Sequence, residues 1–413
     1  MKILQINKYH YLRGGSDKVY LETSKLLQKN GHDIIHFSTV NPKNEFSPTA
    51  SYFVKDPDFL GQNLFMKIKS SFRYIYSYEA KRKLTKLIED HRPEIAHLHI
   101  FFGELSLSIL SVLRKHKIPV VMTLHDFKLL CPIYSLYDQN NSICEKCAKG
   151  NLLHCIQKKC NKGSYAYSTL ASLESYVREL WYSYDKHIDH FLAVSKFSMY
   201  KHLEYRDDIA DKISCLHNFI EYSSSSITHG HESYYCYFGR MSREKGLMTL
   251  VKAFEENGLE LKLAGDGPYR QELEQYCQHN SIRNITFVGH QSGKALEHLV
   301  GQAKFSIVPS ECYESFGLVV VESMRFGTPV IASNIGAISE LVEHQHTGFL
   351  FTSGQFNSMQ QAIMLADSQS IDSYQELSEN CIQFVNKFNS QNHYTSLMRT
   401  YEEVVNRNRE SHP

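Results

Sequence analysis

The sequence predicts an α/β protein built from two doubly wound, Rossmann-like domains that face each other across a cleft. Its 413 residues exceed what one hydrophobic core usually serves. Short apolar runs alternate with amphipathic stretches at helical spacing, which is typical of parallel sheets with crossover helices. A polar, serine-rich segment without periodicity, EYSSSSITHGHES, separates two sets of such runs and indicates a linker.

The strands follow from the apolar runs. In the first half they are expected at KILQI, HDIIHFS, EIAHLHI, IPVVMTL and HFLAVS, and in the second half at SYYCYFG, LELKLAG, NITFVG, KFSIVPS and TPVIAS. Helical patterns lie between them, for example Val19 to Gln28, Tyr269 to Cys277 and Phe316 to Phe326.

The linker is placed at Ser223 to Glu232, which gives an N-terminal domain over residues 1–225 and a C-terminal domain over 233–385. Residues 386–413 have a helical pattern, and we expect them to pack back toward the N-terminal domain.

Composition excludes several classes of protein. Lys plus Arg number 45 and Asp plus Glu 44, so no basic excess supports nucleic-acid binding. No apolar run approaches the roughly 20 residues of a membrane span. The opening MKILQINKYH alternates polar and apolar residues, unlike a signal peptide, so we expect a cytoplasmic protein.

In the N-terminal half, three strand ends carry polar or glycine residues. Gly14 and Gly15 precede a helix expected from about Ser16; they suit either a tight turn or close backbone approach to an anion at the helix N-terminus. The strand IPVVMTL ends at His125, a position that faces a cleft in this fold class. His97 and His99, at the end of another strand, are weaker candidates.

In the C-terminal half, Arg240 and Lys245 flank the turn after the strand SYYCYFG. Two cations at a strand-to-helix junction suit a diphosphate, with Arg as a fork and Lys as a point charge. The alternative is a solvated charge cluster that includes Arg243 and Glu244.

Two glutamates surround an apolar run in the segment SECYESFGLVVVESM. With a helix beginning near residue 315 or 316, Glu314 lies at its entrance and Glu322 about two turns inside, ~12 Å away along the axis. That separation suits the two ends of an extended ligand. The N-terminal amides of Phe316, Gly317 and Leu318 would meet an anion between them. A chance pair of surface glutamates is less favoured, because the apolar neighbours would bury the charge of Glu322.

These motifs together resemble glycosyltransferase family 4, a family of retaining enzymes with the GT-B fold that use nucleotide-activated sugars. The resemblance covers nearly the whole chain. Its specific part is FGRMSREKG, AGDGP, FVGH and PSECYESFGLVVVESMRFGTPVIASNIGAISEL, in the family's order. Glu314 and Glu322 match the E-x7-E signature, which implies contacts to the donor sugar's hydroxyls and to the nucleotide ribose, respectively.

The resemblance assigns four further residues. Arg240 and Lys245 match the diphosphate-binding pair, Gly15 the glycine near the donor phosphate, and His125 the cleft histidine beside the transferred sugar. It implies a retaining reaction without a metal or other cofactor, a nucleoside diphosphate sugar as donor, and a glycan or lipid-linked acceptor in surface polysaccharide assembly.

Ala337 and Ser339 stand where the family often has Gly and Pro, which puts the geometry of that loop in doubt. Two other functions stay open. One is a nucleotide-sugar epimerase of the same fold, and the other is a non-catalytic partner subunit. The donor sugar, the base and the acceptor are not specified by these residues.

A cysteine-rich insertion at residues 131–160 lies outside the resemblance. Cys144, Cys147, Cys155 and Cys160 have a spacing compatible with a structural four-thiolate zinc site. Unliganded thiols, together with Cys131, are the alternative. Disulfides are not expected in a cytoplasmic enzyme.

A basic segment from Met66 to Arg92 also lies outside it. Aromatic residues alternate there with Lys67, Lys69, Arg73, Lys81, Arg82, Lys83 and Lys86, which suits peripheral contact with an anionic membrane at the inner face of the cell membrane. An ordinary solvated helix explains the pattern equally well.

Overall fold

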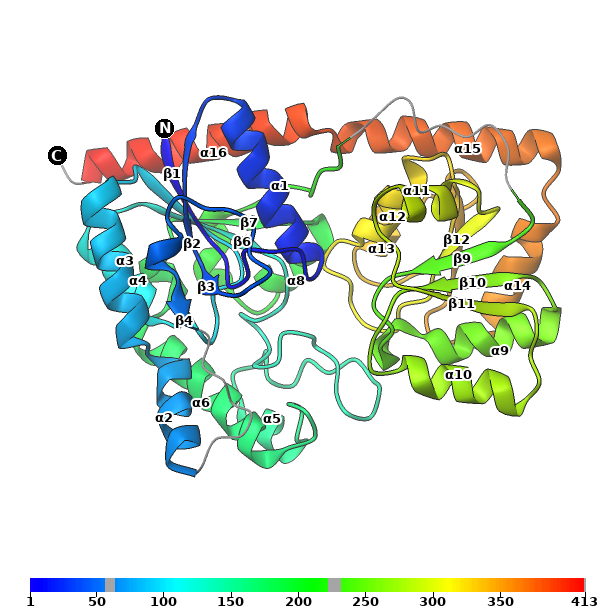
Figure 1. Cartoon of the computed structure of the whole chain (residues 1–413), viewed down its shortest axis with the longest axis horizontal. Coiled ribbons are helices and arrows are strands. Elements are labelled where there is room, and N and C mark those ends of the chain that lie inside the picture. Colours follow the sequence, from blue (N-terminus) through cyan, green and yellow to red (C-terminus); the bar gives the residue numbers. More distant parts are fainter. Residues whose placement is uncertain (56–63, 222–231, 412–413) are drawn as a thin grey trace.

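The structure, a computed structural model, describes residues 1–55, 64–221 and 232–411, and for 64–69 and 411 it describes the backbone alone. Two six-stranded parallel sheets form its two halves, side by side along the long axis of the molecule (Figure 1). Of the predicted serine-rich linker, Ser223 to Glu232, all residues but Glu232 lie outside the described residues.

The N-terminal sheet has the strand order β2-β1-β5-β6-β7-β8. Its strands are Lys2–Ile6 (β1), Asp33–Phe37 (β2), Ile95–Leu98 (β5), Val120–Leu124 (β6), His190–Ala193 (β7) and Ile213–Cys215 (β8). A two-stranded pair, Thr39–Val40 (β3) and Val54–Lys55 (β4), lies beside it.

The C-terminal sheet has the order β11-β10-β9-β12-β13-β14, the doubly wound order with its switch point between β9 and β12. Its strands are Tyr235–Phe238 (β9), Leu261–Ala264 (β10), Ile285–Gly289 (β11), Phe305–Val308 (β12), Val330–Ser333 (β13) and Gly348–Phe351 (β14). The predicted fold class is therefore confirmed, and every predicted strand is present.

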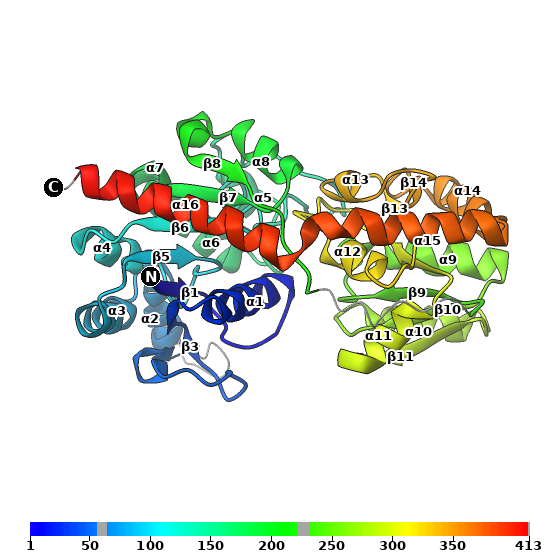
Figure 2. The same ribbon diagram turned by 90° about the horizontal axis from the view of Figure 1, so that it is seen from above.

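Helices cover both faces of each sheet (Figure 2). In the first half they are Gly15–Lys29 (α1), Leu64–Ile75 (α2), Tyr78–His91 (α3), Ser108–Lys115 (α4), Leu153–Gln157 (α5), Tyr165–Trp181 (α6), Tyr184–His187 (α7) and Lys196–Leu203 (α8). The second half has Leu247–Asn257 (α9), Arg270–His279 (α10), Gly293–Gly301 (α11), Leu318–Met324 (α12), Ile338–Leu341 (α13), Phe356–Asp367 (α14), Ile371–Val385 (α15) and Ser390–Ser411 (α16). None of these helices is long and apolar enough to cross a membrane, as far as the described residues go.

The strand alternation builds the two layers of the N-terminal core. Leu4 and Ile6 of β1 face one apolar cluster with α3 and α4, whereas Ile3 faces another that includes Leu397 and Tyr401 of α16. Successive residues of a strand point to opposite faces, so one apolar strand serves both layers.

The C-terminal helix belongs spatially to the first half of the molecule. Figure 2 shows α15 along the C-terminal half and α16 continuing across the N-terminal half. Leu397, Met398, Tyr401, Val404 and Val405 are buried there against the N-terminal sheet. The chain thus crosses between the halves twice, once after β8 and once between α15 and α16.

Candidate functional site

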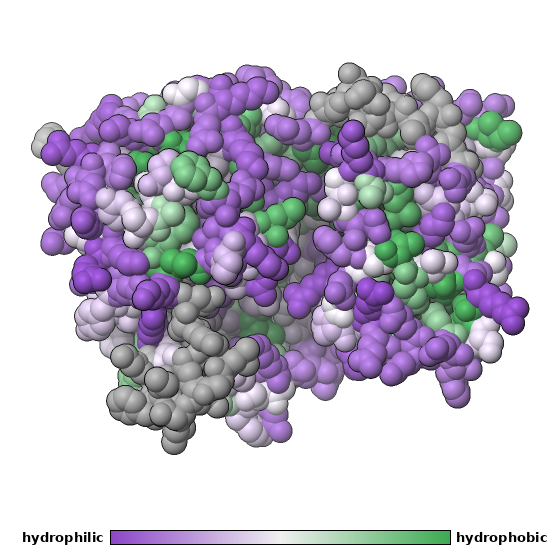
Figure 3. Space-filling model, in the orientation of Figure 1, coloured by the Kyte–Doolittle hydropathy of each residue, from purple (hydrophilic) through white to green (hydrophobic). Residues whose placement is uncertain are grey.

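The site lies where the two halves meet. Figure 3 shows the surface hollowed between them. Gly15, the first residue of α1, lies directly opposite α12, because a Cβ placed on it would be 3.2 Å from Leu318 Cδ1. Two helix N-termini, one from each domain, therefore approach each other at this point.

Lys245 and Glu314 form an ion pair on the C-terminal side of the cleft. Lys245 ends the short 3-10 helix Arg243–Lys245 after β9, and Glu314 lies in the loop after β12, which is the neighbouring strand. Gly246, with φ +67°, brings the two loops together: a Cβ there would lie 2.0 Å from the Pro309 carbonyl oxygen. The same Glu314 oxygen accepts a hydrogen bond of 2.6 Å from Ser310 Oγ.

This pair is partly enclosed, with side-chain exposures of 25% for Lys245 and 18% for Glu314. Burial alone would lower the pKa of Lys245, but the charge and hydrogen bond of Glu314, together with Cys312 and Tyr237, outweigh it and the pKa is raised. Burial would raise the pKa of Glu314, but the charge and hydrogen bond of Lys245 hold it below its usual value. Both groups are thus charged at neutral pH.

Arg240 lies two residues beyond β9 and is exposed. Its guanidinium forms no ion pair with any residue in the described ranges, whereas the neighbouring Arg243 pairs with Glu272 at 2.6 Å. Its backbone is held by Tyr237, whose hydroxyl donates to the Arg240 carbonyl at 2.7 Å. Arg243 thus fits the alternative of a solvated charge cluster, whereas Lys245 does not.

Glu322, on α12, forms an ion pair across the domain boundary with Lys18 of α1. Lys18 also lies 3.7 Å from Glu22. Residues 18 and 322 are far apart in sequence, and a lysine one turn into a helix gives no sequence signal of such a contact. Sequence reasoning therefore missed Lys18.

His125 follows β6 and faces the same boundary. Its carbonyl oxygen accepts a hydrogen bond of 2.6 Å from Ser315 Oγ, and Ser315 in turn accepts one of 2.7 Å from Ser195 Oγ. Burial lowers the pKa of His125 to about 3, so its ring is neutral. Burial raises the pKa of the adjacent Asp126 to about 6.

The α12 helix begins later than the sequence predicted, at Leu318. Gly317 adopts φ +100°, a left-handed conformation that a helix cannot contain. Glu314 consequently lies in a loop four residues before the helix, so the axial separation based on a continuous helix was wrong. Phe316 is buried among apolar side chains, which leaves only its backbone for a ligand.

The departures at Ala337 and Ser339 leave the loop geometry intact. Ala337 has φ −72°, which any residue adopts, and its N–H donates to the Glu314 carbonyl at 3.0 Å. The preceding Gly336 takes the left-handed φ of +60°, and a Cβ placed on it would lie 2.8 Å from the backbone N and O of Glu314. Ser339 Oγ donates to Asn334 Oδ1 at 2.7 Å.

The cysteine-rich insertion gathers its five thiols around one small pocket. Cys160 shares a hydrogen bond with Cys155 and lowers the pKa of that thiol, and Lys158 Nζ lies 3.7 Å from Cys144 Sγ. Across the described chain, no group of three or more His, Cys, Asp or Glu side chains is arranged to hold a metal ion. The four-thiolate zinc site is thus not preformed in the structure and stays a prediction.

The basic segment from Met66 to Arg92 forms two helices, α2 and α3, instead of one. Ser77 caps α3 by accepting from Ala80 N. Arg73 and Lys83 both pair with Glu79, at 2.7 and 3.2 Å, so two basic residues of the segment share one carboxylate.

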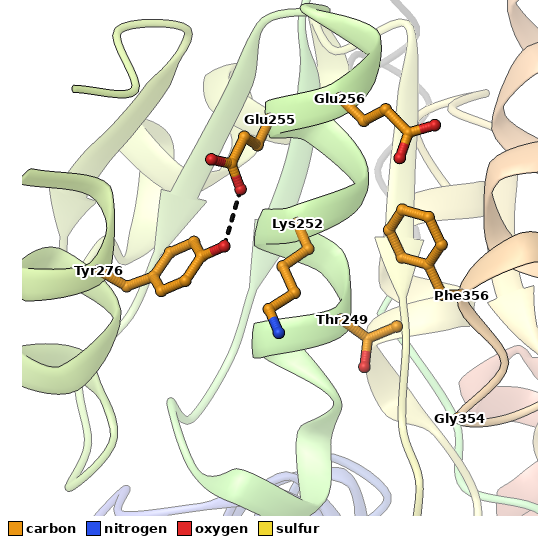
Figure 4. Close-up of a pocket in the computed structure, with 7 residues that line it drawn as sticks. All are labelled: Thr249, Lys252, Glu255, Glu256, Tyr276, Gly354 and Phe356. Carbon is orange, nitrogen blue, oxygen red and sulfur yellow. Dashed lines mark hydrogen bonds between the residues drawn. The ribbon is translucent and has the colours of Figure 1, made fainter. Parts of the chain in front are cut away.

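A depression of about 610 Å³ lies elsewhere on the C-terminal domain, between α9, α10 and the start of α14 (Figure 4). Tyr276 donates to Glu255 at 2.8 Å beside it. None of the predicted site residues lines this depression, and its charged side chains belong to an open surface.

Comparisons with known proteins agree with this geometry. The family models "Glycosyltransferase Family 4" and "Glycosyl transferases group 1" match residues 13–224 and 220–384. The two halves are thus the two domains of a GT-B fold, and the chain belongs to glycosyltransferase family 4.

Curated relatives match over different lengths. An uncharacterized glycosyltransferase of Methanocaldococcus jannaschii is 28% identical over 169 residues, 41% of this chain and 47% of that protein. A second one from the same organism is 34% identical over 117 residues, 27% of this chain and 30% of its own length. The chain thus spans less than half the length of these relatives. An uncharacterized 42.6 kDa protein in the cps region of Klebsiella pneumoniae is 22% identical over 83% of this chain and 87% of its own.

Solved structures share the fold over almost the whole chain. Anabaena HepE in complex with UDP has a TM-score of 0.67 at 18% identity and covers 98% of this chain and 100% of its own. Sucrose-phosphate synthase from Thermosynechococcus elongatus has a TM-score of 0.70 at 20% identity, with 98% of each chain covered.

Proposed function

We propose that this protein transfers a sugar, with retention of configuration, from a nucleoside diphosphate sugar to a glycan or lipid-linked acceptor. The observation that carries the proposal is the Lys245–Glu314 pair at the domain boundary. It holds a cation for a leaving diphosphate directly beside a carboxylate that can accept hydrogen bonds from sugar hydroxyls.

The reaction breaks the bond between the anomeric carbon and the diphosphate oxygen. The acceptor hydroxyl forms the new bond on the same face of the sugar, and its proton passes to the departing phosphate oxygen. Lys245 and the exposed Arg240 stabilise the charge that develops on the diphosphate. Glu314, kept ionised by Lys245, orients the sugar, and Glu322 accepts from the ribose.

Two comparisons support the donor and the pathway. HepE, which shares the fold, is described with UDP, with UDP and glucose, and with UDP-glucose. A relative that aligns with most of the chain comes from a cps region, which favours surface polysaccharide assembly.

The test begins with a thermal-shift screen of nucleotide sugars, since a ligand that binds only the folded state raises its melting temperature. The donor that binds is then incubated with candidate acceptors, and NMR determines the anomeric configuration of the product. Transfer with retention is expected. Conversion of the donor to an epimer without acceptor would establish the epimerase instead. Binding without any turnover would favour the non-catalytic subunit.

The lipid-linked acceptor would place the protein at the inner face of the cell membrane. Exposed side chains support this part of the proposal: Phe72 is 72% and Tyr78 78% exposed, and Lys81, Arg82 and Lys86 are exposed on α3. Membrane surfaces attract such mixed basic and aromatic patches.

Co-sedimentation with phosphatidylglycerol vesicles should remove the protein from solution at low salt, and phosphatidylcholine vesicles should not. A variant with Lys81, Arg82 and Lys86 changed to Gln should lose most of the binding, since each cation contributes about 1 kcal/mol near an anionic surface. Equal binding of both proteins would refute the membrane contact.

A further inference from the structure

A continuous chain of buried polar groups runs from the cleft through the N-terminal domain. His125 Nε2 lies 2.8 Å from His99 Nδ1, and His99 Nε2 lies 2.9 Å from Gln5 Oε1. Gln5 Nε2 is directed to Tyr401 Oη at 3.4 Å. Gln5 and His99 have no exposed surface, so each polar atom depends on its partner in the chain.

Three adjacent strands and the C-terminal helix create this arrangement. Gln5 on β1 is in register with His97 on β5, and β5 lies between β1 and β6. His97 Nδ1 lies 2.6 Å from Tyr401 Oη of α16, and its Nε2 lies 2.7 Å from Thr123 Oγ1. The end of this hydrogen-bonded series away from the cleft therefore contacts α16, which follows α15 of the other domain.

The chemistry of these groups fixes where the protons are. An amide oxygen only accepts hydrogen bonds, so His99 must carry its proton on Nε2 to bond with Gln5 Oε1. Burial lowers the pKa of His99 well below the ordinary value, and a neutral imidazole has one proton. His99 Nδ1 is then an acceptor, and His125 must donate to it from Nε2.

We propose that Gln5 and His99 are positioning residues that hold His125 as the Nε2–H tautomer, so that its Nδ1 offers a lone pair to the cleft. His125 Nδ1 forms no hydrogen bond with any residue that the structure describes, and the side chain keeps some exposure. A lone pair there accepts from a hydroxyl of a bound sugar. This role rests on the proposed function.

Nuclear magnetic resonance of ¹⁵N-histidine-labelled protein at neutral pH tests the tautomer without any substrate. A His125→Asn spectrum assigns the ring signals. We expect His125 Nε2 in the protonated range, Nδ1 in the unprotonated range, and a coupling through the hydrogen bond between His125 Nε2 and His99 Nδ1. A proton on His125 Nδ1, or a charged ring, would overturn the proposal.

Substitutions separate positioning from a general loss of stability. His99→Leu should remove the coupling and give a mixture of His125 tautomers. His99→Asn, whose amide oxygen can take the place of Nδ1, should keep the single Nε2–H form. Ser24→Ala is the control, because it removes a buried hydroxyl that bonds only to the Tyr20 carbonyl in the same domain. A single Nε2–H tautomer in His99→Leu would show that His99 does not set it.

Kinetics with the donor identified in the screen provide a second readout. His99→Leu should lower kcat about tenfold, the effect of one hydrogen bond to the reacting sugar, while Ser24→Ala and His99→Asn stay near wild type. Correct tautomers in a protein that transfers no sugar would refute the proposed function but leave this inference standing. Sugar transfer by a protein in which His125 carries its proton on Nδ1 would support the proposed function and refute this inference.

Discussion

At the scale of single residues, the cleft contains charges that the fold has already paired. Lys245 contacts Glu314, and Lys18 contacts Glu322, so each signature glutamate has a lysine partner. A diphosphate that binds beside Lys245 would be a second anion next to an amine that Glu314 already keeps protonated. The amine therefore stays charged while phosphate leaves.

Lys245→Ala and Arg240→Ala should each cost roughly 2–4 kcal/mol of transition-state stabilisation, by analogy with a lost oxyanion donor. The measurement is kcat/KM with the donor found in the screen. Arg243→Ala is the matched control, since its side chain is 58% exposed and paired with Glu272. Near-wild-type turnover in both Lys245→Ala and Arg240→Ala would contradict the assigned role.

Substitutions of the two glutamates should distinguish contacts to the sugar from contacts to the nucleotide. Glu314→Gln should weaken sugar transfer and leave affinity for the bare nucleoside diphosphate almost unchanged. Glu322→Gln should weaken binding of the nucleoside diphosphate itself, because the ribose is present with or without the sugar. Each loss should be roughly 1–3 kcal/mol, as for a hydrogen bond to a charged group. Calorimetry with the nucleoside diphosphate decides, and equal losses in both variants would refute separate roles.

Residue types at strand ends carried most of the sequence-based prediction of the site. Lys245 and Glu314 could be found because each follows a recognisable strand, and they do meet. Lys18, Gln5 and Tyr401 could not, because their importance comes from contacts between residues hundreds of positions apart. Such contacts depend on how the domains dock, which no local pattern encodes.

At the scale of elements, strands with a clear apolar run were predictable, but the edge strand β14 was not. The strand β14 starts with Gly348, where an added Cβ would lie 2.0 Å from the Val330 carbonyl oxygen. Only the pairing with β13 makes this segment a strand. Likewise, α12 was predicted two residues too long at its start because the pattern carries no sign of the Gly317 backbone conformation.

The turn before α9 gives a prediction at this scale. Gly246 and Gly258 flank the helix with nearly equal φ, +67° and +71°, but only Gly246 has backbone in the way of a Cβ. Gly258→Ala should lower the free energy of unfolding by about 1–2 kcal/mol, which is the strain of a non-glycine residue in the left-handed conformation. Gly246→Ala should lower the free energy of unfolding clearly more. It should also reduce activity, because the loop of Lys245 must move away from Pro309. Urea unfolding of both variants is the measurement, and equal losses would contradict the close approach.

At the scale of the whole molecule, polar contacts hold the two domains against each other. Glu340 of α13 accepts from the backbone N–H groups of Lys196, at 3.1 Å, and Phe197, which begin α8 in the other domain. A carboxylate at a helix N-terminus is favoured by the helix dipole. Ser315 adds the bond to the His125 carbonyl, and α16 ties the C-terminal domain to the N-terminal sheet.

The pH dependence of this contact follows from Glu340. Burial would raise the pKa of Glu340, but His217, 3.7 Å away, and the hydrogen bonds from the α8 amides hold it below the ordinary 4.5. A carboxyl group with a depressed pKa stabilises the contact above its unfolded pKa and loses that effect as pH falls through the folded value. The docked arrangement should therefore be complete at neutral pH and loosen only in acid below about 4.5.

Removing the interdomain charges should open the molecule in solution. We expect the double variant Glu340→Ala, Lys18→Met to have a larger radius of gyration than the wild type at neutral pH. It loses both the α8 contact and the Lys18–Glu322 pair. The control is Glu343→Ala, Lys25→Met. The control changes the same residue types on or next to the same helices. Each of its contacts stays within one domain, because Lys25 pairs with Glu45 and Glu343 lies 3.8 Å from His346. Small-angle X-ray scattering is the measurement. Equal scattering from both variants would show that the apolar contacts and α16 hold the domains together without these charges.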